Sequence, residues 1–254
     1  GTWNIDDVAY ASAAAAGLTG PTGASVGTRQ GFSILQYTGT AGARTISHGL
    51  GKKPDFWLVK DWIGANDWVV YHSAYGAEKY FAFNTTGYVS DASDVWNDTE
   101  PTSSVFSLGT SNIINGNSDG SNYKYVAYLW ANVPGLQKFG KFAGNGDNSG
   151  TYVELGFRPA LVIIKRADSG TCNWGTNDDQ RLQYNQTWGN DLSLYVNSNG
   201  VESSSSSLNV DFLSSGIKLR SNNTCYNTTG GTYIYMAWAY QPMNNLYGAQ
   251  SNAR

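Results

Sequence analysis

A short apolar run, entered through a Gly and a Pro, occurs twice and constrains the fold of this chain more than any other feature. The two copies are Leu50–Lys60 and Leu155–Lys165, and their Gly, Pro and final Lys residues are each 105 positions apart. Gly permits a tight turn, Pro restricts φ, and an apolar β-rich run then follows. The pattern predicts a buried strand that was built twice.

Further matches follow in the same order along both halves, with offsets of 106, 113, 106 and 108. They pair Trp68 with Trp174, Asn84–Gly87 with Asn197–Gly200, Phe106 with Phe212, and Tyr125–Ala131 with Tyr233–Ala239. Ordered matches of this kind predict an internal duplication over residues 31–134 and 135–242. Two copies are too few for a solenoid, so a pair of related β domains or one sandwich made from two similar halves fits.

The composition favours strands. The chain of 254 residues has 9 Trp, 17 Tyr and 9 Phe, and only 14% of its residues are charged. Aromatic and β-branched residues favour strands, and helix formers such as Glu, Lys, Met and Gln are scarce. Strand-length runs alternate with Gly-, Asn- and Ser-rich turns, as in all-β sandwiches. We expect two related antiparallel β-sandwich units, jelly-roll-like, in one or two domains.

The two ends of the chain differ from its middle. Ala11–Ala16 is a run of small residues, and Gly17–Ser25 contains three Gly-x-y triplets in phase. Residues 1–30 therefore predict either a flexible linker or a short triple-stranded neck that holds a trimer. Residues 243–254 predict a polar C-terminal tail. Because the chain begins at Gly1, we expect a processed product or a fragment.

Charge and hydropathy argue against two classes of partner. The net charge is −3 and Lys and Arg form no cluster, so we expect no nucleic-acid binding. The longest apolar runs fall well short of the ~20 residues of a membrane span, so we expect no membrane insertion. Cys172 and Cys225 both lie in polar loops of the second copy, and the sequence does not decide between a disulfide and two free thiols.

Catalytic patterns are weak. The two histidines, His48 and His72, have no counterpart in the other copy, and no nucleophile-elbow or zinc-ligand spacing accompanies them. His48 precedes a strand, where a hydrogen-bonded structural histidine is expected. The carboxylate pairs that glycoside cleavage would need are Asp178 with Asp179 and Asp94 with Glu100, whose separations the sequence does not give. We expect no catalytic residues and no enzyme activity.

Two acidic loops resemble calcium-binding loops, but only in their composition. Asn145–Gly150 and Asn115–Gly120 are rich in Asn, Asp and Gly, but neither has the Glu at position 12 of a helix-flanked calcium loop. The same residues are ordinary turn formers. We therefore expect no metal and no cofactor, with calcium as the alternative.

Aromatic residues in loops are the best candidates for binding. Trp57, Trp130 and Trp238 lie within strand patterns and predict core positions. Trp68 and Trp174 recur in the two copies, which also predicts core packing. Aromatic residues in or beside polar loops, without a matching aromatic in the other copy, are Trp62, Tyr75, Trp96, Trp188 and Tyr226. An exposed ring offers a flat apolar face for stacking on a sugar. Partial burial under a long loop, or at a subunit contact, is the alternative.

Several phrases of this chain resemble a domain of unknown function. They are His48–Pro54, Trp68–Ser73, Asn84–Gly87, Val105–Gly109, Val210–Gly216 and Gly230–Ala239. The resemblance covers residues 31–241. The family is common at the C-terminal ends of virion proteins from tailed phages, including marine phages and cyanophages. It implies an externally displayed virion protein, such as a tail fibre or receptor-binding domain, and supplies no established catalytic residues.

The sequence and the resemblance together lead to one hypothesis and two alternatives. The hypothesis is a tail-fibre or receptor-binding domain, located on the virion surface, that attaches to a host surface polysaccharide or outer-membrane receptor without catalysis. It would be a homotrimer among other virion proteins, where avidity lets each site be weak. The alternatives are a purely structural virion component, such as a capsid decoration or fibre-shaft module, and a polysaccharide depolymerase.

Overall fold

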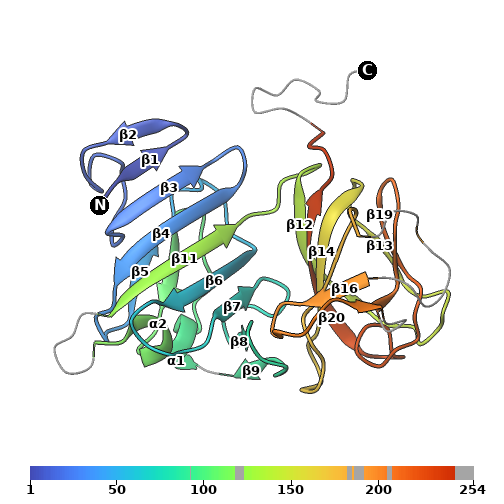
Figure 1. Ribbon diagram of the computed structural model, residues 1–254. Coiled ribbons are helices and arrows are strands. Elements are labelled where there is room, and N and C mark those ends of the chain that lie inside the picture. The colour runs from blue at the N-terminus through green and yellow to red at the C-terminus, as the bar shows by residue number, and fades with distance from the viewer. Residues whose placement is uncertain (92, 118–122, 182–184, 186–191, 205–207, 244–254) are drawn as a thin grey trace. The chain divides into compact units, whose positions relative to one another are not determined.

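The chain forms two units (Figure 1). The computed structural model describes residues 1–91, 93–117, 123–181, 185, 192–204 and 208–243. Unit 1 contains Gly1–Ala82 and Ser90–Asn132, and unit 2 contains Phe83–Val89 and Val133–Arg254. The sequence placed the division between residues 134 and 135. The observed division lies close by, except that the segment 83–89 belongs to unit 2.

The described part of unit 1 consists of strands and two short helices. Its elements are β1 (Trp3–Ile5), β2 (Val8–Tyr10), β3 (Gly23–Gly27), β4 (Phe32–Thr38), β5 (Arg44–Ser47), β6 (Phe56–Asp61), β7 (Val69–His72), β8 (Lys79–Ala82), β9 (Ser90–Asp91), α1 (Ser93–Trp96), β10 (Val105–Leu108), α2 (Asn112–Asn115) and β11 (Lys124–Trp130). Among the described residues, one nine-stranded sheet has the order β2-β1-β3-β4-β11-β6-β7-β8-β9, and β10 pairs separately with β5.

Unit 2 consists of strands in its described part. They are β12 (Gln137–Ala143), β13 (Tyr152–Glu154), β14 (Pro159–Arg166), β15 (Gly175–Asp178), β16 (Leu192–Tyr195), β17 (Ser203–Ser204), β18 (Val210–Phe212), β19 (Gly216–Leu219) and β20 (Thr232–Ala239). The sheet orders that the structure describes here are β12-β20-β14-β15-β16-β17 and β13-β19-β18. No helix in the described ranges has the length and hydropathy to cross a membrane. The predicted all-β class is confirmed.

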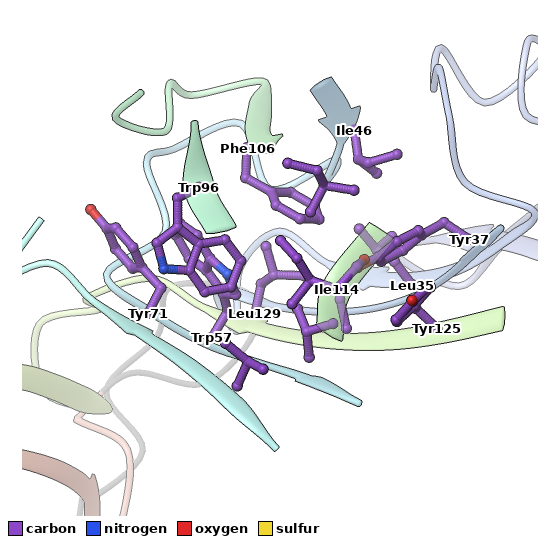
Figure 2. Close-up of a cluster of buried hydrophobic side chains, with 14 of the residues drawn as sticks. Leu35, Tyr37, Ile46, Trp57, Tyr71, Trp96, Phe106, Ile114, Tyr125 and Leu129 are labelled. Carbon is purple, nitrogen blue, oxygen red and sulfur yellow. The ribbon is translucent and has the colours of Figure 1, made fainter. Parts of the chain in front are cut away.

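Each unit buries its core between a large and a small sheet, a β-sandwich-like arrangement. In unit 1 the core cluster joins Tyr37 and Trp57 of the large sheet with Ile46 and Phe106 of the β5–β10 pair (Figure 2). The corresponding cluster of unit 2 also combines residues from both of its sheets, among them Val162 and Phe212. Alternating apolar residues along each strand produce these faces.

The two copies of the repeated Gly-Pro phrase lead into strands with the same neighbours. β6 lies between β11 and β7, and β14 lies between β20 and β15, all antiparallel. Six strands of unit 1, β4-β11-β6-β7-β8-β9, therefore stand in the same chain order as the six strands of the large sheet of unit 2. Gly51 and Gly156 both have positive φ, 69° and 83°, which favours glycine at the turn before each strand.

Residues 1–30 are not the linker or neck that their composition predicted. They contain β1, β2 and β3, and β3 pairs along β4. Leu18, Ala24 and Val26 belong to the core of unit 1. The alternation of Ala24 and Val26 places both on one strand face, a signal that the Gly-x-y spacing concealed. β1 also pairs in parallel with β3, so the large sheet is not wholly antiparallel as expected.

A buried asparagine closes the loop between β4 and β5 in unit 1. Asn115 Nδ2 donates to the carbonyl oxygens of Gly42 and Gly109, both at 2.8 Å. Its Oδ1 accepts from Thr40 N at 3.1 Å, and its carbonyl oxygen accepts from Ala41 N at 2.7 Å. A single side chain thus fixes a loop more than seventy positions away in the chain.

Unit 2 repeats this network at Asn227. Its Nδ2 donates to the carbonyl oxygens of Asp147 and Ser221, both at 2.8 Å, and also to Asn145 Oδ1. Its Oδ1 accepts from Asn145 N at 3.1 Å, and its carbonyl oxygen accepts from Gly146 N at 2.7 Å. The loop between β12 and β13 is therefore closed as the β4–β5 loop is.

A tyrosine accompanies each of these asparagines. The hydroxyls of Tyr125 and Tyr233 each accept from the backbone N of the residue after the asparagine and donate to the carbonyl oxygen three positions before it. Tyr125 stacks on Tyr37 and Tyr233 stacks on Phe142, both with ring centroids 5.1 Å apart. The ends of the two units near these loops are built alike.

A disulfide distinguishes unit 2. Cys172, in the loop after β14, is bonded to Cys225, in the loop before β20, with their Cα atoms 5.1 Å apart. The sequence left this pairing open, because loop spacing alone does not show that two cysteines meet.

Candidate functional site

Trp62 is the most exposed tryptophan side chain in the part of the chain that the structure describes. It lies directly after β6, is 53% exposed, and is followed by Ile63, which is 59% exposed. Single exposed apolar residues are common on protein surfaces. A Trp and an Ile side by side on one loop form a larger apolar contact area, and Trp is enriched where binding energy concentrates.

The loop that carries Trp62 is organised by a buried carboxylate. Asp61 is the last residue of β6, is fully buried, and accepts hydrogen bonds from Ile63 N at 2.8 Å and Gly64 N at 3.0 Å. Asn66 Nδ2 donates to its other oxygen at 2.9 Å. An Asp that binds the backbone two residues ahead forms a local turn. A Cβ at position 64 would collide with the Asp61 carboxylate, so this turn requires Gly64.

Two further contacts hold the loop. Lys60 Nζ donates to the carbonyl oxygens of Asp61 at 2.5 Å and Gly64 at 3.3 Å. Trp62 N donates to Lys124 O at 3.2 Å, which extends the pairing of β6 with β11 by one residue. The backbone of Trp62 is therefore held by the turn that follows it and by its hydrogen bond to β11. A pre-ordered loop loses little conformational entropy when it binds.

The pairing of β6 and β11 places lysines beside this loop. Trp57 and Val59 of β6 face the core, so Lys60 points to the opposite face of the sheet by strand alternation. The register pairs Lys60 with Val126 and continues to Trp62 and Lys124. We use the term Trp62 surface for the residues on this face and loop, which are Lys60, Trp62, Ile63, Trp68 and Lys124.

Trp68 is the member of the Trp62 surface that lies next to β7. It directly precedes Val69, a core residue of β7, so alternation turns Trp68 to the face of Lys60. Its ring is stacked toward Tyr128 with centroids 6.3 Å apart, and the side chain is half-buried. The sequence predicted a core position for Trp68. The structure instead places it on the sheet face opposite the core of unit 1.

Tyr75 does not join Trp62. It follows β7, and β7 runs antiparallel to β6, so Tyr75 lies toward the start of β6 while Trp62 lies at its end. The Tyr75 ring is half-buried and meets the edge of Phe81 with centroids 5.6 Å apart. These two predicted binding residues therefore do not form one site.

The expectation of an exposed ring at Trp96 is wrong. Trp96 lies in α1, is fully buried, and packs edge-on against Trp57 at 5.2 Å and Tyr71 at 6.2 Å (Figure 2). Its Nε1 donates to Lys79 O at 3.1 Å, which satisfies its buried polar atom. The polar residues around it in the sequence face outward, and the helix turns the indole into the core.

Tyr226 is likewise a core residue rather than a binding residue. It is 2% exposed, belongs to the core cluster of unit 2, and burial raises the pKa of its hydroxyl. It follows Cys225, which the disulfide fixes in place. The remaining candidate, Trp188, lies outside the described residues.

The candidate carboxylates have structural partners. Glu100 accepts from Ala77 N at 2.6 Å, Tyr71 OH at 2.8 Å and Lys53 Nζ at 2.7 Å. Burial acts to raise the pKa of Glu100, but these hydrogen bonds, led by that of Lys53, outweigh it and lower the pKa. A carboxylate that stays ionised at neutral pH is not suited to be a general acid.

The second carboxylate pair is engaged in the same way. Asp178 forms an ion pair with Arg181 and accepts from Gln180 N at 3.1 Å. Burial acts to raise the pKa of Asp178, and the bonds to Arg181 lower it by more. The Asp179 side chain is bonded by Gln180 Nε2 at 3.3 Å. Asp94, the partner proposed for Glu100, is exposed in the first turn of α1.

His48 is a structural residue, as the sequence predicted. It is fully buried, its Nδ1 accepts from Leu50 N at 3.2 Å, and its Nε2 lies 3.2 Å from Thr102 O. Burial lowers the pKa of the ring, which keeps it neutral with the proton on Nε2. His72 is also buried, and its Nδ1 accepts from Ala74 N at 3.2 Å.

The loops with calcium-like composition have other roles in the structure. In the 145–150 loop, oxygens of Asn145 and Asp147 accept hydrogen bonds from the amide of Asn227. Part of the 115–120 loop lies outside the described residues, and Asn115 forms the matching network. Across the described ranges, His, Cys, Asp and Glu side chains form no group of three that could hold a metal ion.

A shallow polar depression lies elsewhere in unit 1. It has a volume of about 430 Å³ and is lined by Glu78, Lys79, Asp91, Ser93 and Asp98. Lys79 and Asp91 form an ion pair across it. The depression is wide open, and none of the predicted binding residues that the structure describes lines it.

Comparison with known proteins gives one match. Neither a curated protein nor a solved structure matches this chain. A family model matches residues 2–242, a range that runs from before β1 to beyond β20. The chain therefore belongs to the family described as "Domain of unknown function (DUF7483)".

Proposed function

We propose that this protein is a non-catalytic receptor-binding domain of a phage virion, such as a tail-fibre domain, that attaches to a host surface glycan through the Trp62 surface. The observation that carries the proposal is the exposed Trp62 and Ile63 pair on a turn fixed by the buried Asp61. Stacking of a sugar ring on an indole needs a flat apolar face with hydrogen-bonding groups nearby. The Trp62 surface has both.

The location on a virion rests on the resemblance of the motifs to phage virion proteins. A fibre tip carries several copies of its binding domain, so weak sites act together through avidity. A homotrimer is the assembly that we propose. An exposed site such as Trp62 and Ile63 suits this mode, because no single site needs to be tight.

The proposal includes an origin by duplication of one antiparallel, jelly-roll-like sandwich module. The shared order of six strands and the matched networks of Asn115 and Asn227 support it. Binding would then have arisen on one copy only. At the offset of the repeated phrase, Trp62 corresponds to Ala167, which is fully buried. Function added to one copy of a scaffold is expected on its loops.

Binding to purified host-surface polysaccharide tests the proposal. Trp62→Ala should abolish most of the binding without loss of stability, because its side chain is largely exposed. Tyr240→Ala is the matched control, since Tyr240 is also 53% exposed and lies in unit 2. We expect the control to bind like the parent protein in pull-down and surface plasmon resonance.

Other outcomes point to the alternatives. If neither the parent protein nor its variants bind any surface polysaccharide, and labelling places the protein at regular capsid positions, a structural virion component replaces the proposal. If incubation with the polysaccharide releases reducing ends, the protein is a depolymerase.

A further inference from the structure

Two lysines of the Trp62 surface carry charges that no acid balances directly. Lys124 is exposed and Lys60 is half-buried. Neither forms an ion pair within the described part of the chain, whereas Lys53 and Lys79 do. Lys60 Nζ is bonded only to carbonyl oxygens there, so one of its three donors is unused.

Each of these lysines lies beside one of the two tryptophans. The register sets Lys124 opposite Trp62, and extension of the β6–β7 pairing by one residue sets Lys60 opposite Trp68. Asp67 is the exposed acid of this loop, and the Asp61 carboxylate is directed to backbone amides. Among the described residues of this face and loop, two lysines therefore stand against one exposed acid, on a chain whose net charge is −3.

We propose that the ligand of the Trp62 surface is an acidic polysaccharide, which stacks a sugar ring on Trp62 and places a carboxylate or phosphate group near Lys124 and Lys60. This inference rests on the proposed glycan-binding function and names its substrate class. A lysine is a point charge on a flexible stem, so it accommodates either anionic group. Complementary charge of this kind speeds encounter and disfavours neutral polymers.

Polygalacturonate and its carboxyl-reduced form are the matched probes, since they differ only in the acid group. Phosphomannan tests the phosphate source. We expect both acidic polymers to bind more tightly than the reduced polymer, and their binding to weaken as salt rises. Lys124→Gln should weaken the binding of acidic polymers by about two- to five-fold, which is the effect expected for one exposed charge contact. Its effect on binding of the reduced polymer should be smaller, because that polymer has no acid group to pair with the lysine.

Lys52→Gln is the control, because it removes the same charge before the other end of β6. Equal binding of polygalacturonate and its reduced form, or equal effects of the two lysine variants, overturns the acidic-ligand inference while the glycan-binding function stands. If the Trp62→Ala variant still binds all of the polymers, the proposed glycan binding through the Trp62 surface is overturned. Equally tight binding of single-stranded DNA also overturns the inference, because charge alone would then explain the attraction.

Discussion

At the scale of single residues, the surroundings of each tryptophan decide its role. Trp62 and Trp96 both lie among polar residues, and neither has an aromatic counterpart in the other half of the sequence. Trp62 stands on a turn that directs it to solvent, and Trp96 stands on a helical turn that directs it into the core. The burial of Trp96 depends on its contacts with β6 and β7, which lie more than twenty residues earlier in the chain.

Trp96→Ala should therefore destabilise unit 1 by about 3–5 kcal/mol, the usual cost of removing a large buried aromatic ring. Trp62→Ala should change the free energy of unfolding by less than about 0.5 kcal/mol, as for other exposed positions. Urea denaturation of both variants checks this. Equal losses of stability would contradict the different burial of the two rings.

Lys165 gives a prediction about pH. It is fully buried, its Nζ donates to Thr86 O at 3.2 Å and Arg166 O at 2.8 Å, and burial lowers its pKa to about 8. In the unfolded chain its pKa is near the ordinary 10.5. Between these values the unfolded state binds more protons, so stability rises with pH across this window.

The effect of Lys165 is isolated by comparison with Lys165→Met. As pH rises from 7 to 10, the parent protein should gain up to about 2–3 kcal/mol of unfolding free energy relative to the variant. Denaturant titrations at several pH values measure the difference, and tyrosine ionisation cancels because both proteins share it. A constant difference across this pH range would show that Lys165 does not release its proton near pH 8.

At the scale of elements, one buried asparagine in each unit holds in place a loop that lies far from it in the sequence. Asn115 and Asn227 each bind, through backbone and side-chain atoms, a distant loop that joins the large sheet of the unit to its small sheet. The sequence comparison missed this pair because the insertions around it shift the offset to 112 positions. The tyrosine that follows each of them in the last long strand was the available signal.

Asn115→Ala and Asn227→Ala should each destabilise their own unit by about 2–3 kcal/mol, because buried carbonyl and amide groups lose their partners. Hydrogen exchange should become faster at Thr40 and Ala41 in the first variant, and at Asn145 and Gly146 in the second. Asn222→Ala, at an exposed position, should leave both loops unchanged. Exchange that rises equally in both loops for either variant would contradict a local role.

The sequence predicted strands better than it predicted surfaces. The repeated Gly and Pro led to β6 and β14, because a fixed turn and an apolar run are local signals. The surface of Lys60 and Lys124 was missed, because it depends on β11 pairing with β6 across more than sixty residues. The strands within residues 1–30 were missed because β1 and β2 have only three residues each, and because the small residues of Ala11–Ala16 and of β3 resemble a linker.

At the scale of the whole molecule, the two units differ most in their covalent links. The disulfide Cys172–Cys225 closes a loop of 53 residues in unit 2, and unit 1 has no cysteine. Because both ends of the loop flank strands of the large sheet, the link restricts the unfolded state of that sheet.

Replacing both cysteines with serine should lower the stability of unit 2 by up to about 4 kcal/mol, from the loop-closure entropy of that length. Hydrogen exchange in peptides from β14 and β20 should become faster, and peptides from β6 and β11 in unit 1 serve as the internal control. Unchanged exchange in β14 and β20 would mean that the bond contributes little to the stability of unit 2.

Hydroxyl-radical footprinting with and without an acidic polysaccharide tests the binding role of Trp62 most directly, because it reads the solvent exposure of individual side chains. In the free protein, Trp62 should be oxidised strongly, while the buried Trp57, Trp96 and Trp174 should react little. On addition of the polysaccharide, oxidation of Trp62 and Ile63 should fall while that of Tyr240 stays constant. Protection of Tyr240 or other distant residues, with Trp62 still fully reactive, would contradict this account.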